Sequence, residues 1–364
     1  MTSAKLVLLS TALASLTATV FAQTPTPKPP PDDDVIKVSS RLVVVPVSVT
    51  DDKGDPVVSL TAADFRVSEE GRQQAVESVG SADVVPLEIA LLFDISASTD
   101  AMFRFEQETA AKFLRDVMKP TDRATIFTVG ERGVLVQPRD TSERSIASIR
   151  AIMPTKEQTA FYDAVRLASE HLRRNAPEGV RKVMVIISDG EDTNSEGVIR
   201  AIWNAERRIT DDVQGEKLRD LRVKARDGAK LAEQARVVRS LQDADAVFFS
   251  INPAGSSYRL NKMSVFGQQN MERFAKETGG SAFLPSFLPI DTKDNYLNDN
   301  NSRKNQEILD RIFRQLANEL RAQYLIQYYS EADFPANRFV KVDIGVPGRA
   351  GIRIRSREGY FVKN

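Results

Sequence analysis

The chain has 364 residues, with 50 basic and 50 acidic side chains, so its formal net charge is zero. This balance gives no overall basic surface for nucleic acid or for an anionic membrane, and we expect neither as a partner. The sequence contains no cysteine, which excludes disulfide bonds, thiolate metal sites and cysteine nucleophiles.

The start of the chain has the composition of an export signal followed by a linker. Lys5 precedes a largely apolar stretch, and Val20-Phe21-Ala22 resembles a cleavage site. The alternative is an uncleaved membrane anchor, but the apolar stretch contains Ser and Thr and is short for a spanning helix. Residues 23–34 are rich in proline and end in three aspartates, as in an extended linker. We therefore expect residues 1–22 to be a signal peptide, and the mature protein, without a membrane span, to be secreted or periplasmic.

The two flanks of the chain predict β-structure. Residues 35–85 begin with a β-branched run at 41–49, and the acidic segment 51–55 predicts a hairpin turn because it lacks the spaced ligands of an EF-hand. Residues 322–364 again predict strands, at 323–329, 339–344 and 352–355. Neither flank has enough strands to be stable alone, so we expect the two to join in one small sandwich-like domain.

Between the flanks, residues 86–321 alternate apolar strands with helices, which predicts a mostly parallel α/β sheet with helices on both faces. A polar loop is expected at 285–301, before a final helix at 306–320. Segment 196–243 predicts one or two charged helices inserted into this domain. Such helices are either a solvated surface or a surface for binding a partner.

Oxygen-bearing side chains follow two buried strands and precede one helix. Asp94, Ser96 and Ser98 follow the apolar run that begins at Leu87, Thr159 precedes a helix, and Asp189 follows the apolar run 182–188. Ligands bind at the carboxyl ends of strands in open α/β sheets, and hard divalent cations prefer oxygen ligands. These side chains are therefore candidate metal ligands. The alternative for the serines is an ordinary helix N-cap.

This pattern resembles the von Willebrand factor type A domain with its metal-ion-dependent adhesion site. In that family Asp-x-Ser-x-Ser follows the first strand, a Thr lies on a later loop and an Asp follows the fourth strand. Asp94-Ile95-Ser96-Ala97-Ser98, Thr159 and Asp189 match these positions, and the resemblance covers about residues 86–320. The flanks resemble those of exported bacterial proteins with a related domain, through the segments FRVSEEGRQQ at 65–74 and REGYF at 357–361.

The resemblance implies a bound divalent cation, Mg²⁺ or alternatively Mn²⁺ or Ca²⁺. Ser96, Ser98 and Thr159 would contact it directly or nearly so, and Asp94 and Asp189 directly or through water. One exchangeable position on the cation could then accept an acidic side chain from a partner protein.

The sequence thus predicts an exported, metal-dependent protein-binding module, with Asp192 and Thr193 as candidates for supporting the ligands. One alternative is a structural component of an envelope assembly without metal-dependent binding. Another is a metal-dependent hydrolase using Glu191 or Asp192 as a base. We expect no enzyme, because His171 is the sole histidine and neither a Gly-x-Ser-x-Gly elbow nor a phosphate-binding loop with Lys is present.

Overall fold

The computed structural model describes residues 41–96, 100–155, 158–207, 214–253, 262–290 and 292–362. The predicted signal peptide and linker, and the candidate ligand Ser98, lie outside these ranges. Within them, no helix is both long enough and apolar enough to cross a membrane.

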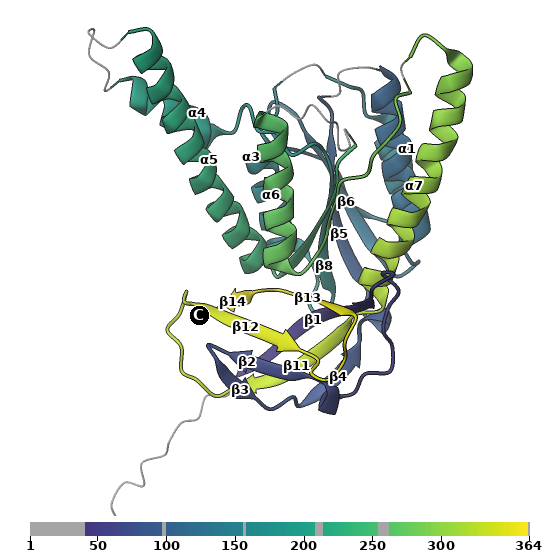
Figure 1. Ribbon diagram of the computed structural model, residues 1–364, viewed down its shortest axis with the longest axis vertical. Coiled ribbons are helices and arrows are strands. Elements are labelled where there is room, and N and C mark those ends of the chain that lie inside the picture. Colours follow the sequence, from purple (N-terminus) through teal and green to yellow (C-terminus); the bar gives the residue numbers. More distant parts are fainter. Residues whose placement is uncertain are drawn as a thin grey trace, which may run out of the picture. The chain divides into compact units, whose positions relative to one another are not determined.

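A six-stranded sheet forms the centre of the larger domain, in the order β10-β9-β8-β5-β6-β7 (Figure 1). Its strands are β5 (Leu87–Asp94), β6 (Arg123–Val129), β7 (Val134–Asp140), β8 (Arg181–Ile187), β9 (Ala246–Ile251) and β10 (Ala282–Phe283). All neighbouring strands are parallel except β7, which runs antiparallel to β6. The predicted mostly parallel sheet is confirmed.

Helices cover both faces of this sheet, which is why β5 is buried along its whole length. On one face, α1 (Asp100–Val117), α2 (Ser142–Ala151) and α7 (Asn295–Arg321) pack with Ile89, Leu91 and Phe93. On the other, α3 (Phe161–Asn175), α4 (Glu196–Glu206), α5 (Glu216–Ala244) and α6 (Lys262–Thr278) pack with Ala90 and Leu92. Alternate residues of one continuous apolar strand therefore enter two separate cores.

The prediction of a polar loop over residues 285–301 is wrong in its second half, because α7 already begins at Asn295. Asp294 caps the helix by accepting a hydrogen bond from the backbone N–H of Leu297 at 3.0 Å. Asparagines inside the helix then bind the loop that precedes it: Asn301 donates to the carbonyl of Pro289 at 2.7 Å, and Asn305 donates to that of Leu288 at 2.8 Å. These side chains anchor the loop while the backbone remains helical.

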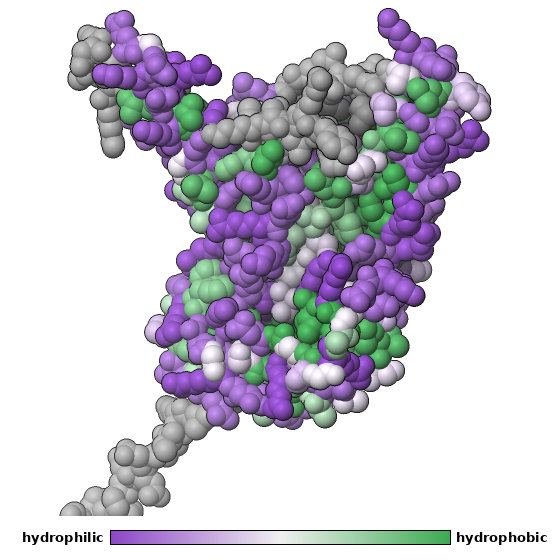
Figure 2. All heavy atoms as spheres, in the orientation of Figure 1, coloured by the Kyte–Doolittle hydropathy of each residue, from purple (hydrophilic) through white to green (hydrophobic). Residues whose placement is uncertain are grey.

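The inserted segment contains two helices, α4 and α5, which form a hairpin extending outward at the end of the sheet where β5 and β8 terminate (Figure 1). Arg222 joins the helices through an ion pair with Glu206 at 2.8 Å. Most of the hairpin surface visible in Figure 2 is hydrophilic. Trp203, the sole tryptophan of the chain, is 62% exposed on α4.

The flanks form two four-stranded sheets, β13-β1-β11-β4 and β14-β12-β2-β3. The N-terminal flank supplies β1 (Arg41–Asp51), β2 (Arg66–Glu69), β3 (Arg72–Gln74) and β4 (Ser78–Ser81), with short 3-10 helices at Ala62–Asp64 and Ala82–Val84. The C-terminal flank supplies β11 (Tyr324–Ser330), β12 (Phe339–Gly345), β13 (Ile352–Ser356) and β14 (Gly359–Phe361). Because β1 pairs with both β11 and β13, and β2 pairs with β12, the predicted joining of the two ends is confirmed.

The two small sheets share one apolar core and one buried carboxylate. Val45, Val47 and Ile326 are fully buried in this core. The buried Glu69 accepts hydrogen bonds from the hydroxyls of Tyr328 at 3.0 Å, Tyr360 at 2.7 Å and Ser330 at 2.7 Å. Three side chains of the C-terminal flank thus satisfy a carboxylate of the N-terminal flank that would be costly to bury alone.

Ile326→Ala should destabilise the protein by about 3 kcal/mol, because it leaves a cavity in the core that both flanks build. Leu42→Ala, on the neighbouring strand β1 and 48% exposed, is the matched control and should cost less than about 1 kcal/mol. Denaturant unfolding of the two variants measures both values. Equal, small losses would contradict a shared core.

Candidate metal site

Asp94 is the last residue of β5 and is only 5% exposed. Its Oδ1 accepts hydrogen bonds from the backbone N–H of Ser96 at 3.0 Å and from the Ser96 hydroxyl at 2.7 Å. Its Oδ2 accepts one from the Ser188 hydroxyl at 2.7 Å. Three donors thus hold the carboxylate at the carboxyl end of the central strand.

Asp189 lies close to Asp94 because β5 and β8 are parallel neighbours, with Phe93 paired to Ile187. One Asp189 oxygen accepts a hydrogen bond from the backbone N–H of Glu191 at 2.9 Å. Burial, with the negative charge of Asp94 as the next cause, raises the pKa of Asp189 to about 7. Burial also raises the pKa of Asp94. The two carboxylates are therefore near enough to repel each other in a poorly solvated site.

Thr159 lies on the loop before α3 and is bound to the segment that follows Asp189. Its backbone N–H donates to the Thr193 hydroxyl at 2.8 Å. Its carbonyl accepts from the backbone N–H groups of Thr193 at 2.8 Å and Asn194 at 3.0 Å. The structure therefore brings the Thr159 loop and the Asp189 loop together, with Thr193 between them.

Asp192 supports the same loop from the inside. Its carboxylate accepts hydrogen bonds from the backbone N–H of Tyr162 at 3.2 Å and from the Ser195 hydroxyl. Its backbone carbonyl accepts one from Lys230 Nζ on α5 at 2.8 Å. Asp192 thus joins the Asp189 loop to the start of α3 and to the inserted hairpin.

Glu106 is an acidic residue near the site that the motif does not include. Its side chain is buried on α1, and its pKa is raised well above the usual range by burial and by the charges of Asp94 and Asp189. The sequence carries a signal for it, because Glu106 occurs at helical spacing from the core residues Phe103 and Phe113. A charged residue on an apolar helix face indicates a special environment.

These residues fit a hard divalent cation. Among the described residues, no lysine or arginine forms an ion pair with Asp94, Asp189 or Glu106, so the buried negative charge has no counter-ion of its own. The described residues also contain no group of three or more His, Cys, Asp or Glu side chains that could hold a metal ion. A cation here would therefore need hydroxyl oxygens beside the two aspartates, as the motif implies.

The Asp189 loop contacts α6 through two glycines. Gly190 has a left-handed φ of +75°, and a Cβ there would collide with the carbonyl of Gly267. A Cβ on Gly267 would lie 2.6 Å from the carbonyl oxygen of Asp189. Asn270, one turn further along α6, donates to the Gly190 carbonyl at 3.2 Å. This close backbone contact requires glycine on both sides.

Residues 89–191 match the family model of the von Willebrand factor type A domain. The chain therefore carries a domain of this family. The matched range begins within β5 and ends just after Asp189, so it contains all five candidate metal ligands but not Asp192 or Thr193. No curated protein sequence matches the chain.

Comparison with solved structures gives distant similarities. BatB from Bacteroides thetaiotaomicron, a conserved hypothetical protein, is 16% identical with a TM-score of 0.34, covering 62% of this chain and 99% of BatB. The PilB minor pilin from Streptococcus sanguinis is 12% identical with a TM-score of 0.41, covering 65% and 63%. Proximal thread matrix protein 1 from the mussel byssus, with a zinc-occupied MIDAS motif, is 12% identical with a TM-score of 0.40, covering 69% and 50%.

Gly190→Ala should destabilise the protein and displace the Asp189 loop, because the new Cβ meets the α6 backbone. Gly54→Ala is the matched control, since Gly54 also has a positive φ, +88°, but has open space around its Cβ position. The control should cost about 1 kcal/mol of backbone strain, and Gly190→Ala about 1–3 kcal/mol more. Denaturant unfolding compares the two, and equal costs would contradict the close contact.

Proposed function

We propose that this protein is an exported, metal-dependent protein-binding module. A divalent cation, Mg²⁺ in the first instance, would be held between the Asp94 loop, the Thr159 loop and the Asp189 loop. An acidic side chain of a partner protein would complete its coordination. The observation that supports this most directly is that the buried Asp94 and the partly buried Asp189 lie close together at the carboxyl ends of two neighbouring parallel strands, with no basic counter-ion among the described residues.

Each candidate ligand has a distinct part in this proposal. Ser96 already contacts Asp94, so a cation beside the carboxylate would meet its hydroxyl oxygen as well. Thr159 would approach from the loop that Thr193 fixes. Ser98 belongs to the same motif by its position in the sequence. The bound cation would supply an electrophilic centre for an oxygen ligand.

A site with two carboxylates and several neutral hydroxyls favours an anionic partner group. Hydroxyl ligands leave more of the positive charge of the cation uncompensated than carboxylates do, so a further carboxylate is attracted. Asp94 and Asp189 give two negative charges, whereas a third acidic ligand from within the chain would weaken this attraction. Glu106 is buried on α1, and its raised pKa favours the neutral form in the absence of metal.

We propose binding rather than catalysis. The sole histidine, His171, lies on α3, where its ring packs edge-to-face against Phe127 and its Nδ1 contacts Asn175 at 3.2 Å. Asp192, one of the two possible bases, already accepts hydrogen bonds from Tyr162 and Ser195. The other, Glu191, accepts one from the Ser264 hydroxyl at 2.5 Å. Among the described residues of the site, neither Glu191 nor Asp192 is therefore an evident general base.

Export is part of the proposal and rests on the sequence of residues 1–22. A chain without cysteine is compatible with an oxidising compartment, since it has no thiol to protect. The proposed partner would then be a protein of the same compartment.

The mature protein, stripped of metal, should bind one equivalent of Mg²⁺ or Mn²⁺ in a calorimetric titration, and Asp94→Ala should abolish this binding. Asp116→Ala on α1, which removes a partly exposed aspartate outside the site, is the matched control and should bind like the wild type. Binding should also raise the thermal midpoint of the wild type, because the ligand stabilises the folded state. If wild type and Asp94→Ala bind alike, the site is elsewhere.

A carboxylate should displace water from the bound metal. With Mn²⁺ in the site, addition of acetate should lower the water-proton relaxation rate of the wild-type protein, because a metal-bound water is replaced. The same titration with an uncharged amide, acetamide, should leave the rate nearly unchanged. An identical response to both probes would contradict an exchangeable position that prefers acidic groups.

A further inference from the structure

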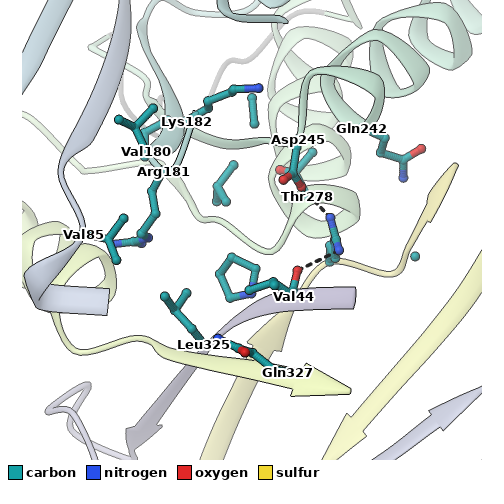
Figure 3. A pocket seen from close by; sticks show the side chains of 17 residues that line it. Val44, Val85, Val180, Arg181, Lys182, Gln242, Asp245, Thr278, Leu325 and Gln327 are labelled. Carbon is teal, nitrogen blue, oxygen red and sulfur yellow. Dashed lines mark hydrogen bonds and ion pairs between the residues drawn. The ribbon is translucent and has the colours of Figure 1, made fainter. Parts of the chain in front are cut away.

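A cavity of about 390 Å³ lies at the other end of the central sheet, where β8 and β9 begin. Its opposite wall is formed by β1 and β11 of the small sheets. Figure 3 shows Val85, Val180 and Arg181 on one side of it, Asp245 and Gln242 on the other, and Leu325 below. This volume is in the range of small-molecule binding sites.

The cavity wall is mostly apolar. Side chains from five separate segments contribute to it: Val44, Val85, Val180, Val247 and Leu325. Val44 belongs to β1 but is 37% exposed, because it points away from the sandwich core that its neighbours Val43 and Val45 enter. The wall would therefore favour a ligand with an apolar body.

Arg181 provides a buried positive charge at this wall, and the side chain is only 9% exposed. Its Nη atoms donate to neutral acceptors, namely the carbonyls of Ala82 and Leu320 and the amide oxygen of Gln323. Burial and the nearby Arg321 lower its pKa to about 10. An arginine so buried is normally paired with a carboxylate.

The acidic groups nearest to Arg181 already have other partners. Asp122 forms an ion pair with Arg321, and Asp83 forms one with Lys119. Among the described residues, no carboxylate forms an ion pair with Arg181 itself. The positive charge of this buried group is therefore only partly compensated.

Buried donors without a partner surround the cavity. Arg181 Nε, Gln242 Nε2 and Arg357 Nε lie on residues that line it, are shielded from solvent and make no hydrogen bond within the described chain. All three are donors. Other nitrogens of Arg357 donate to Asp245 at 2.5 Å and to the carbonyl of Val44 at 2.8 Å, as the dashed lines in Figure 3 mark. Arg357 thus already has a carboxylate partner, Asp245, whereas Arg181 has none among the described residues. An occupant of this cavity should bring acceptors.

We propose that this cavity binds a small apolar carboxylic acid, with its carboxylate near Arg181 and its apolar chain among Val44, Val180 and Leu325. The carboxylate supplies the missing acceptor and the missing counter-ion together, and the valine-rich wall covers the chain. The site is separate from the metal site, because it lies at the amino ends of the strands whose carboxyl ends carry Asp94 and Asp189.

Decanoate is the probe that tests this, with decanol as the uncharged molecule of the same chain length. Calorimetry on the full mature protein in EDTA should show one saturable site for decanoate and binding at least about tenfold weaker for decanol, as expected for losing one charge-assisted hydrogen bond. No saturable binding of decanoate, or equal binding of both probes, would overturn the proposal. Because EDTA removes divalent metal, the result does not depend on the proposed function.

Substitutions inside and outside the cavity test whether decanoate binds there. Val180→Trp should fill the cavity and abolish decanoate binding, whereas Val58→Trp, which alters a valine that is 66% exposed and outside the cavity, should bind like the wild type. Arg181→Gln should weaken decanoate about tenfold and decanol little. If Arg181→Gln does not fold, the comparison of Val180→Trp with Val58→Trp decides alone, since neither change touches Arg181. Wild-type affinity in Val180→Trp would show that decanoate binds elsewhere and overturn the proposal.

Discussion

The parallel pairing of β5 with β8 is the constraint on which the candidate site depends. Phe93 is opposite Ile187, so Asp94, the last residue of β5, and Asp189, two residues beyond the end of β8, lie at the same edge of the sheet. A shift of one residue in this register would send alternate side chains to the wrong face of the sheet. Burial of Ile89 and Leu91 on one face and Ala90 and Leu92 on the other therefore specifies the position of the carboxylates. Apolar packing determines where the polar chemistry occurs.

Polar contacts hold the small sheets to the opposite end of the α/β domain. Helix α7 leads directly into β11, and buried polar contacts fasten this junction. Ser48 on β1 donates to the Glu319 carbonyl at 3.2 Å, and the Glu319 side chain accepts from Arg355 on β13 at 2.7 Å. The Gln323 amide also donates to the Ser48 hydroxyl at 3.1 Å. Since these groups are buried, losing one partner would leave another unsatisfied, so the junction favours a single arrangement.

The parts of the fold that follow from local pattern could be predicted from sequence. Continuous apolar runs predict β5 and β8, and the structure places Asp94 and Asp189 close together at the ends of these runs, with Ser96 bound to Asp94. Contacts between distant segments have no such local pattern. Glu106 approaches the site because of how α1 packs on the sheet, although its place on an apolar helix face was a usable signal. The helix start at Asn295 was missed because asparagine usually favours turns, whereas here its side chains bind the preceding loop.

Helices α5 and α6 run between the candidate metal site and the cavity, and the charges that surround them differ at these two places. Near the metal site, Asn270 binds the Gly190 carbonyl and Lys230 binds that of Asp192, so both helices support a loop rich in acidic groups. At their far ends, Gln242 and Thr278 line a cavity where Arg181 and Arg357 supply positive charge. A cation suits the first environment and an anion the second, because each end lacks part of the opposite charge. The strands between them are buried and continuous, so the fold keeps the two proposed binding sites, with their opposite preferences, apart.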